Sequence, residues 1–193
     1  MHVSPAVYRF IVHPAFYTRW FAERYLKPSF ELAGRKVLEF GCGIGVNCII
    51  FDPGLYRGVD IDAERIAYAR KLHPDHRFDV VGTGLSEIDD GACDVVLIGA
   101  VLHHLTDQQI EGYQKEFLRI LKPDGVLIVF EPYLAPNAGV INWFMKLLDE
   151  GKYLRTEDGY LALLRENFEP RVLRRFRVPY LSSIILFIAR RLR

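Results

Sequence analysis

Short apolar runs alternate with longer amphipathic segments from Arg35 onward. The runs have the length and composition of buried strands, while the segments between them place apolar residues at helical spacing. Strands are predicted at residues 36–40, 56–61, 76–81, 93–102 and 125–131. Helices are predicted at residues 45–50, 62–72 and 106–121. Because near-continuous apolar strands separated by helices are typical of parallel sheets covered on both faces, the pattern predicts a doubly wound α/β sheet.

The end of the chain departs from this alternation. Residues 169–178 and 181–191 form two strand-like runs joined only by Pro179 and Tyr180. So short a connection cannot hold a crossover helix, so the two runs should pair antiparallel. The predicted fold class is therefore α/β, with a doubly wound, seven-stranded, mostly parallel sheet and an antiparallel last strand.

The first predicted strand ends in a glycine-rich turn that contains Gly41, Gly43 and Gly45. Glycine permits a positive φ and lets a ligand approach the main chain without meeting a Cβ. Ligands of doubly wound sheets bind at the carboxyl ends of the strands, where a helix start favours a negative group. Asp60 closes the second strand, and a carboxylate there can accept hydrogen bonds from both hydroxyls of a ribose. Although a glycine-rich turn alone is more often only a turn, the two features together predict a cofactor that carries adenosine.

The spacing of the glycines separates two classes of adenosine cofactor. A dinucleotide fingerprint, G-x-G-x-x-G, needs a third glycine at position 46. Val46 stands there, and the third glycine is Gly45. The spacing and the hairpin ending both disfavour a nicotinamide-dependent oxidoreductase.

Four stretches of the chain resemble the successive motifs of class I S-adenosylmethionine-dependent methyltransferases, in particular their small, type 11-like members. These stretches are "VLEFGCGIG", "GVDID", "CDVVLIGAVLHHL" and "LKPDGVLIVFEP", in the family's order, within residues 34–131. The resemblance implies a Rossmann-like methyltransferase fold, and the antiparallel final pair of strands fits it. It also implies an enzyme that uses S-adenosylmethionine as its methyl donor.

The resemblance further implies which residues contact the methionine half of the cofactor. Glu39, Gly41 and Gly43 match the motif that holds this half. Gly99 and Ala100, at the exit of the fourth strand, match positions whose backbone lies near it.

For the nucleoside half, Asp60 matches the acid that binds the ribose hydroxyls, and Ile61 matches the apolar residue packed against adenine. The family often has an acidic or amide residue after the third strand, which holds the adenine amino group. Thr83 stands at the matching place and can still accept a hydrogen bond. The main chain of Gly84 or Leu85 is the alternative contact to the ring.

Two histidines and a tyrosine are candidates for a catalytic base. A sulfonium methyl is already activated, so a base is needed only when the acceptor must lose a proton. His103 and His104 follow the fourth strand, and the ordinary pKa of histidine suits proton transfer near neutrality. His104 is the preferred candidate and Tyr133, beyond the fifth strand, the second. The alternative is that these side chains serve loop structure or packing.

The chain is predicted to be a single domain with four parts. An aromatic helical cap occupies residues 1–33, the cofactor-binding core 34–131, a lid insertion 132–160, and a C-terminal helix and strand hairpin 161–193. The cap and the lid are expected to shape the acceptor pocket. Most of their aromatic residues should pack in the core, but two or three facing the cavity would suit a small apolar or aromatic acceptor.

Composition narrows the partners and the compartment. Half of the 193 residues are apolar and the net charge is +1, which argues against duplex nucleic acid as a partner. Three cysteines without a CxxC pair predict reduced thiols and a cytoplasmic protein, since the first residues do not resemble a secretion signal. The most apolar run, Ser183 to Ala189, is too short to span a bilayer, so no integral membrane segment is expected. A metal is not expected, and the chain should be a monomer or homodimer.

Two alternative functions remain open at this stage. One is a non-catalytic module that binds S-adenosylmethionine for regulation or scaffolding. The other, less favoured, is an NAD-dependent oxidoreductase.

Overall fold

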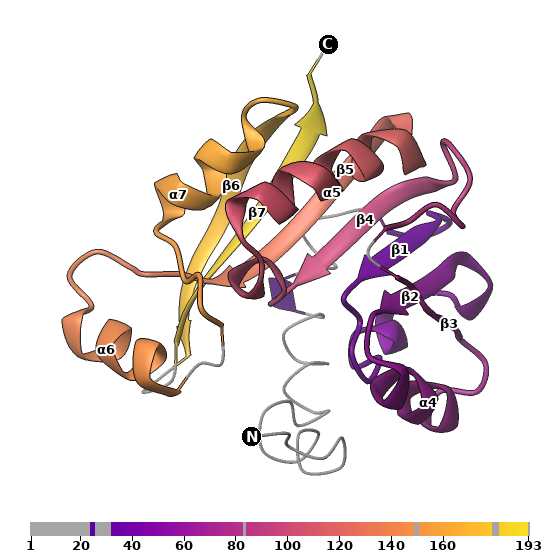
Figure 1. Cartoon of the computed structure of the whole chain (residues 1–193), viewed down its shortest axis with the longest axis horizontal. Coiled ribbons are helices and arrows are strands. Elements are labelled where there is room, and N and C mark those ends of the chain that lie inside the picture. Colours follow the sequence, from indigo (N-terminus) through magenta and orange to yellow (C-terminus); the bar gives the residue numbers. More distant parts are fainter. Residues whose placement is uncertain (1–23, 26–31, 83, 149–150, 179–181, 193) are drawn as a thin grey trace. The chain divides into compact units, whose positions relative to one another are not determined.

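The computed structural model describes residues 24–25, 32–82, 84–148, 151–178 and 182–192 (Figure 1). It divides into two compact units, Met1–Leu85 and Ser86–Arg193, each of which is described by itself. The predicted cap, residues 1–33, lies almost entirely outside the described residues, and so does Thr83. The single-domain organisation stays a prediction.

The first unit contains three parallel strands in the order β3-β2-β1. Their bounds are β1 Val37–Phe40, β2 Tyr56–Asp60 and β3 Arg77–Val80. The helix α4, Ala63–Leu72, connects β2 to β3 and buries Ile66 and Ala69. It begins at Asp62 because the carboxylate of this residue accepts hydrogen bonds from the first-turn amides of Glu64 and Arg65. The predicted second and third strands and the helix between them are confirmed.

The helix predicted at residues 45–50 is wrong. Two short 3₁₀ turns occupy the connection from β1 to β2, namely η2, Cys48–Ile50, and η3, Pro53–Leu55. Gly45 has a left-handed φ of +76°, and Pro53 opens the second turn. Too few residues lie between them for a stable α-helix. No α-helix begins at this turn, so the expectation that a helix start would favour a negative group here loses its basis.

The second unit contains four strands in the order β4-β5-β7-β6. Their bounds are β4 Cys93–Gly99, β5 Leu121–Pro132, β6 Phe168–Val178 and β7 Ser182–Arg191. β4 and β5 run parallel, whereas β7 runs antiparallel to both of its neighbours, β5 and β6. The predicted hairpin is thus confirmed, and β7 is the reversed strand. The seven strands, their directions and their order within each unit confirm the predicted fold class.

Helices accompany these four strands (Figure 1). They are η4 Leu102–His104, α5 Asp107–Ile120, α6 Gly139–Leu148 and α7 Glu157–Leu164. α5 begins at a capping box in which Thr106 and Gln109 satisfy each other's backbone amides. It buries Ile110, Phe117 and Ile120 at helical spacing, and it lies within the helix predicted at residues 106–121.

Candidate functional site

The turn after β1 is built from glycines because its backbone is left-handed. Gly41, Gly43 and Gly45 have φ values of +71°, +53° and +76°, a region in which residues with a Cβ are strained. The amides of Gly41 and Cys42 donate to the carbonyl of Val59, at 2.8 and 3.0 Å. The turn is therefore anchored on the last residues of β2.

Two positions of this turn differ in what surrounds the missing side chain. A Cβ placed on Gly45 would lie 2.6 Å from the Phe78 ring, so packing against β3 requires the glycine. A Cβ placed on Gly43, which is itself buried, would meet no atom of the described residues within 4 Å. Packing among the described residues therefore does not require a glycine here, and the main chain lacks the Cβ that would hinder a ligand.

Asp60 connects this turn to the end of β2. One carboxylate oxygen accepts from the amide of Gly43 at 2.8 Å, and the other accepts from the amide of Asp62 at 2.9 Å. A carboxylate offers about four acceptor positions, so capacity remains for the hydroxyls of a ribose. Ile61 follows directly and is 70% exposed, a large apolar side chain available to a ring system. The cofactor-binding roles of Asp60 and Ile61 stay predictions.

Glu39 supports the turn from inside the first unit. Its carboxyl is buried, and it accepts hydrogen bonds from Asn47 Nδ2, at 2.6 Å, and from the Tyr56 hydroxyl. Burial raises the pKa of Glu39 from 4.5 to about 7; the two hydrogen bonds lower it, and the Asp60 carboxylate raises it further. Sequence reasoning missed Asn47 and Tyr56, because only the pairing of β1 with β2 brings Tyr56 close to Glu39.

The predicted adenine contacts are described only in part. Leu85 is fully buried, and a Cβ on Gly84 would meet no atom within 4 Å. Thr83 lies outside the described residues. The assignment of these three residues stays a prediction.

In the second unit, the chain makes a strained exit from β4. A Cβ on Gly99 would overlap the ring of Phe130 on the neighbouring strand. Ala100 has a φ of +54°, which is unusual for a residue other than glycine, and its amide donates to the carbonyl of Phe130 at 2.9 Å. Such strain persists only where the surroundings enforce it, and it is common at functional sites.

The segment after this exit is held by hydrogen bonds to Glu131, which is fully buried near the end of β5. One carboxylate oxygen accepts from the amides of Val101 and Leu102, at 2.7 and 2.8 Å. The other lies 2.8 Å from His103 Nδ1. His103 is buried, whereas the predicted base His104 is exposed. Sequence reasoning missed Glu131, although its place in the motif "VFEP" was a signal that could have found it.

Tyr133, the second predicted base, lies just beyond β5 and is buried. Its amide donates to the carbonyl of Ser183 at 2.9 Å. Burial raises the pKa of Tyr133, and Glu157 acts in the same direction, while Arg175 and Arg177 oppose it. The phenol is therefore held in its protonated form at neutral pH.

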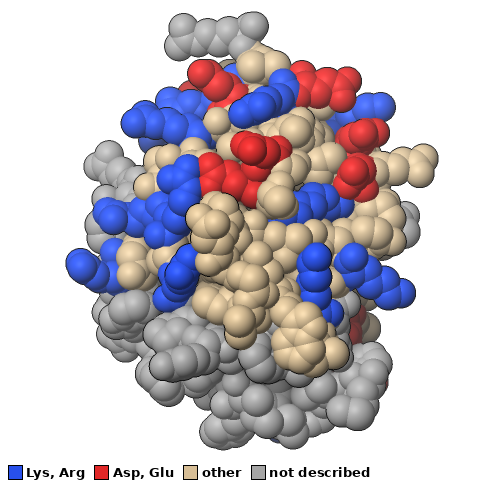
Figure 2. Space-filling view, turned by 90° about the vertical axis from the view of Figure 1, so that its left-hand side faces the viewer, with Lys and Arg blue, Asp and Glu red and all other residues tan. Residues whose placement is uncertain are grey.

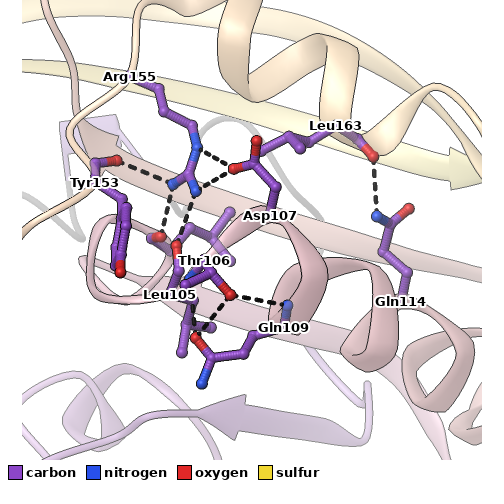
Figure 3. A network of polar contacts seen from close by, with 9 residues as sticks. Leu105, Thr106, Asp107, Gln109, Gln114, Tyr153, Arg155 and Leu163 are labelled. Atoms are coloured by element: carbon purple, nitrogen blue, oxygen red, sulfur yellow. Dashed lines mark hydrogen bonds and ion pairs between the residues drawn. The ribbon is translucent and has the colours of Figure 1, made fainter.

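Arg155 makes several hydrogen bonds to the segment after β4 (Figure 3). Its guanidinium donates to the carbonyls of Leu102 and Leu105, at 2.9 and 2.8 Å, and to the Asp107 carboxylate at 2.5 Å. The amide of Tyr153 donates to the carbonyl of His103 at 2.9 Å. Residues 153–155 thus fix the backbone on which His103 stands.

Other kinds of site find no support in the part of the chain that the structure describes. Within it, no cluster of three or more His, Cys, Asp or Glu side chains could hold a metal ion. No described helix has the length and apolar content needed to cross a membrane. Cys42, Cys48 and Cys93 are buried, and no disulfide joins them.

Residues 38–129 match the family described as "Methyltransferase domain". A probable S-adenosylmethionine-dependent methyltransferase of Mycolicibacterium smegmatis is 34% identical over 120 residues, covering 58% of this chain and 45% of that protein. The human thiol S-methyltransferase TMT1A is 28% identical over 173 residues, covering 81% and 68%. These matches confirm the resemblance to class I S-adenosylmethionine-dependent methyltransferases and imply S-adenosylmethionine as the cofactor.

The fold agrees with these matches. A crystal structure of a SAM-dependent methyltransferase from Aquifex aeolicus superposes with a TM-score of 0.69 at 16% identity, covering 97% of this chain and 99% of that one. This likeness concerns the fold alone. The chain spans about half the length of the Mycolicibacterium relative.

Proposed function

We propose, from the premise that residues 38–129 belong to the methyltransferase domain family, that this protein transfers the methyl group of S-adenosylmethionine to a small molecule. One observation carries the proposal. The left-handed backbone at Gly43 donates a hydrogen bond to the Asp60 carboxylate at the carboxyl end of β2. Such an arrangement presents bare main chain and an acidic acceptor side by side, as an amino-acid nucleoside requires.

The described residues fit the cofactor. Gly41 and Gly43 would lie along its methionine half, with Glu39 beneath the turn. Asp60 would accept the ribose hydroxyls, and the exposed Ile61 would cover the adenine. Gly99 and Ala100 would present backbone to the methionine half, and Thr83, Gly84 and Leu85 would contact the adenine. The cofactor supplies a methyl group on a sulfonium, so the protein has mainly to orient the acceptor and exclude water.

The acceptor is proposed to be small and apolar or aromatic. The name of the human relative, a thiol S-methyltransferase, supports a small-molecule acceptor. The aromatic residues of the predicted cap and lid favour an apolar one. His104 and Tyr133 remain predicted bases, although the exposure of the first and the raised pKa of the second give neither an advantage.

Further expectations belong to the same proposal. The protein should act in the cytoplasm as a monomer or homodimer, without nucleic acid. On the face shown in Figure 2, Asp and Glu side chains lie among the Lys and Arg side chains. Among the described residues, wherever they lie, Arg175 and Glu157 form an ion pair at 2.5 Å. Such mixed charge supports the expectation that this face does not hold a nucleic-acid backbone.

Calorimetry with S-adenosylhomocysteine, followed by transfer of labelled methyl from S-adenosylmethionine, tests the proposal. We expect binding heat, and label in small thiols or phenols. The variant Asp60→Ala should weaken both signals. Asp52→Ala is the matched control, because Asp52 also accepts a backbone amide, that of Gly54 at 2.9 Å, but outside the predicted site.

Each alternative function has its own outcome in these assays. Binding without label in any acceptor would favour the non-catalytic module. The absence of binding heat, together with a thermal shift caused by NAD, would favour the oxidoreductase.

A further inference from the structure

Glu131 is a buried carboxylate to which the proposed cofactor site gives no role. It is 0% exposed, and all of its contacts described above go to the segment directly after β4. Its first oxygen accepts from two backbone amides. The second oxygen instead holds an imidazole, which is a group that can carry a proton.

The geometry defines the state of the His103 ring. A carboxylate oxygen accepts hydrogen bonds, so the 2.8 Å contact with Glu131 assigns the ring proton to Nδ1. In the neutral ring this places the basic lone pair on Nε2. The contacts of Tyr153 and Arg155 with the backbone at residues 102–105 hold the main chain that carries this ring. The arrangement has the parts of a histidine base oriented by an acid.

We propose that His103, oriented by Glu131, is the proton acceptor of the methyl transfer in place of His104. This inference rests on the proposed function. His103 Nε2 takes the proton from an O–H or S–H group of the acceptor. The lone pair left on that oxygen or sulfur forms the new bond to the methyl carbon and displaces a neutral thioether, which keeps the electrons of the broken carbon–sulfur bond. The imidazolium then releases its proton to solvent. Glu131 is a positioning residue and does not take the proton.

The Glu131→Gln variant is the sharpest perturbation, because it keeps the shape of the side chain. The amide oxygen can still accept from Val101 and Leu102, so the segment keeps its backbone contacts. The amide nitrogen then faces His103 Nδ1 as a donor, which forces Nδ1 to accept and moves the ring proton to Nε2. The variant should therefore fold but lack the basic lone pair where the acceptor meets the ring.

Nitrogen NMR of the full chain tests the orientation without any acceptor. We expect His103 to carry its proton on Nδ1 in the unmodified protein and on Nε2 in Glu131→Gln. His73 and His76, which lie in the first unit, are internal controls whose signals should not change. A proton on Nε2 of His103 in the unmodified protein would overturn the inference.

Kinetics test the proton transfer itself. The probes are 4-methylphenol and an alkanethiol, which are protonated at neutral pH, and 4-nitrothiophenol, which is ionised. His103→Asn should slow transfer to the first two by about 10²–10⁴-fold, the usual contribution of a general base, and affect the third far less. Equal losses with all probes, or a loss that follows His104→Asn instead, would overturn the inference. No transfer by the unmodified protein to any probe would contradict the proposed function and this inference together.

The pH profile separates a base from a structural residue. Four residues face or adjoin His103. They are Glu131 from β5, His104 from η4, and Tyr153 and Arg155 from the segment before α7. Replacing the Glu131 charge removes the group that stabilises the imidazolium. The acid limb of kcat/KM should therefore move to lower pH in Glu131→Gln, while its plateau falls at least about tenfold. An unchanged acid limb with a lower plateau would show a merely structural role.

Discussion

Glu39→Gln is expected to change how the stability of the protein depends on pH. The carboxyl has an ordinary pKa of 4.5 in the unfolded chain and about 7 when buried beneath the glycine turn. Between these values the folded state holds a proton that the unfolded state has lost. Raising the pH through this window therefore removes stability, and above about pH 7 no further loss follows.

The magnitude follows from the same two values. Each pH unit between them costs about 1.4 kcal/mol, so the free energy of unfolding should fall by about 3 kcal/mol between pH 4.5 and neutrality. Glutamine does not titrate, and it fits the site. Its oxygen can accept from Asn47, and its nitrogen can donate to the Tyr56 hydroxyl, which also accepts.

Urea unfolding of the two proteins at several pH values between 4.5 and 8 measures the effect. Other groups contribute to both curves, so the difference between them isolates Glu39. The variant should gain about 3 kcal/mol relative to the unmodified protein across this range. Glu64→Gln, at an exposed position of α4 in the same unit, is the matched control and should change little. A difference curve for Glu39→Gln that is flat, or that falls with rising pH, would refute the reasoning.

Three further substitutions test other parts of the structure. Asp60→Ala should weaken S-adenosylhomocysteine binding by about 1–3 kcal/mol, measured by calorimetry, because hydrogen bonds to a charged group are lost; unchanged affinity would show that the cofactor lies elsewhere. Gly99→Ala should lower the free energy of unfolding in urea by about 1–3 kcal/mol, because its methyl group overlaps the aromatic ring beside it on β5. Gly112→Ala should raise this free energy by about 0.5–1 kcal/mol, because a methyl group on α5 at this position meets no described atom within 4 Å. The reverse order of these two would contradict the packing. Arg155→Lys should lower the free energy of unfolding by about 1–3 kcal/mol, because a lysine cannot reproduce the several donors of the guanidinium. The control Arg165→Lys, at an exposed position, should change it by less than about 0.5 kcal/mol. Equal effects of the two variants would disprove the role of the guanidinium.

Local pattern was sufficient for the strands and for the acid at the end of β2. The apolar period and the short connection between the last two strand-like runs are properties of neighbouring residues, so the sequence displays them directly. Asp60 was predictable for the same reason, because it follows an apolar run and precedes a helix cap.

The contacts that organise the segment after β4 could not be read in this way. Glu131 lies 28 residues from His103, and Arg155 lies 50 residues from Leu105. Such pairs depend on the register of β4 with β5 and on where the chain returns after α6. The choice between His103 and His104 also required burial, since both histidines have the same relation to the strand in the sequence. The helix predicted at residues 45–50 failed because the left-handed Gly45 outweighs the apolar spacing after it.

A hydrogen bond of 2.9 Å from the amide of Leu134 to the carbonyl of Arg155 brings together the two ends of the chain segment that contains α6. The segment therefore begins and ends at one place within the second unit. Doubling the length of such an excursion costs only about 0.6 kcal/mol in closure entropy. Exchanging part of this segment, with Leu134, Tyr153 and Arg155 kept, would leave strands β4 and β5 untouched and would test the proposal that the predicted lid sets the acceptor preference.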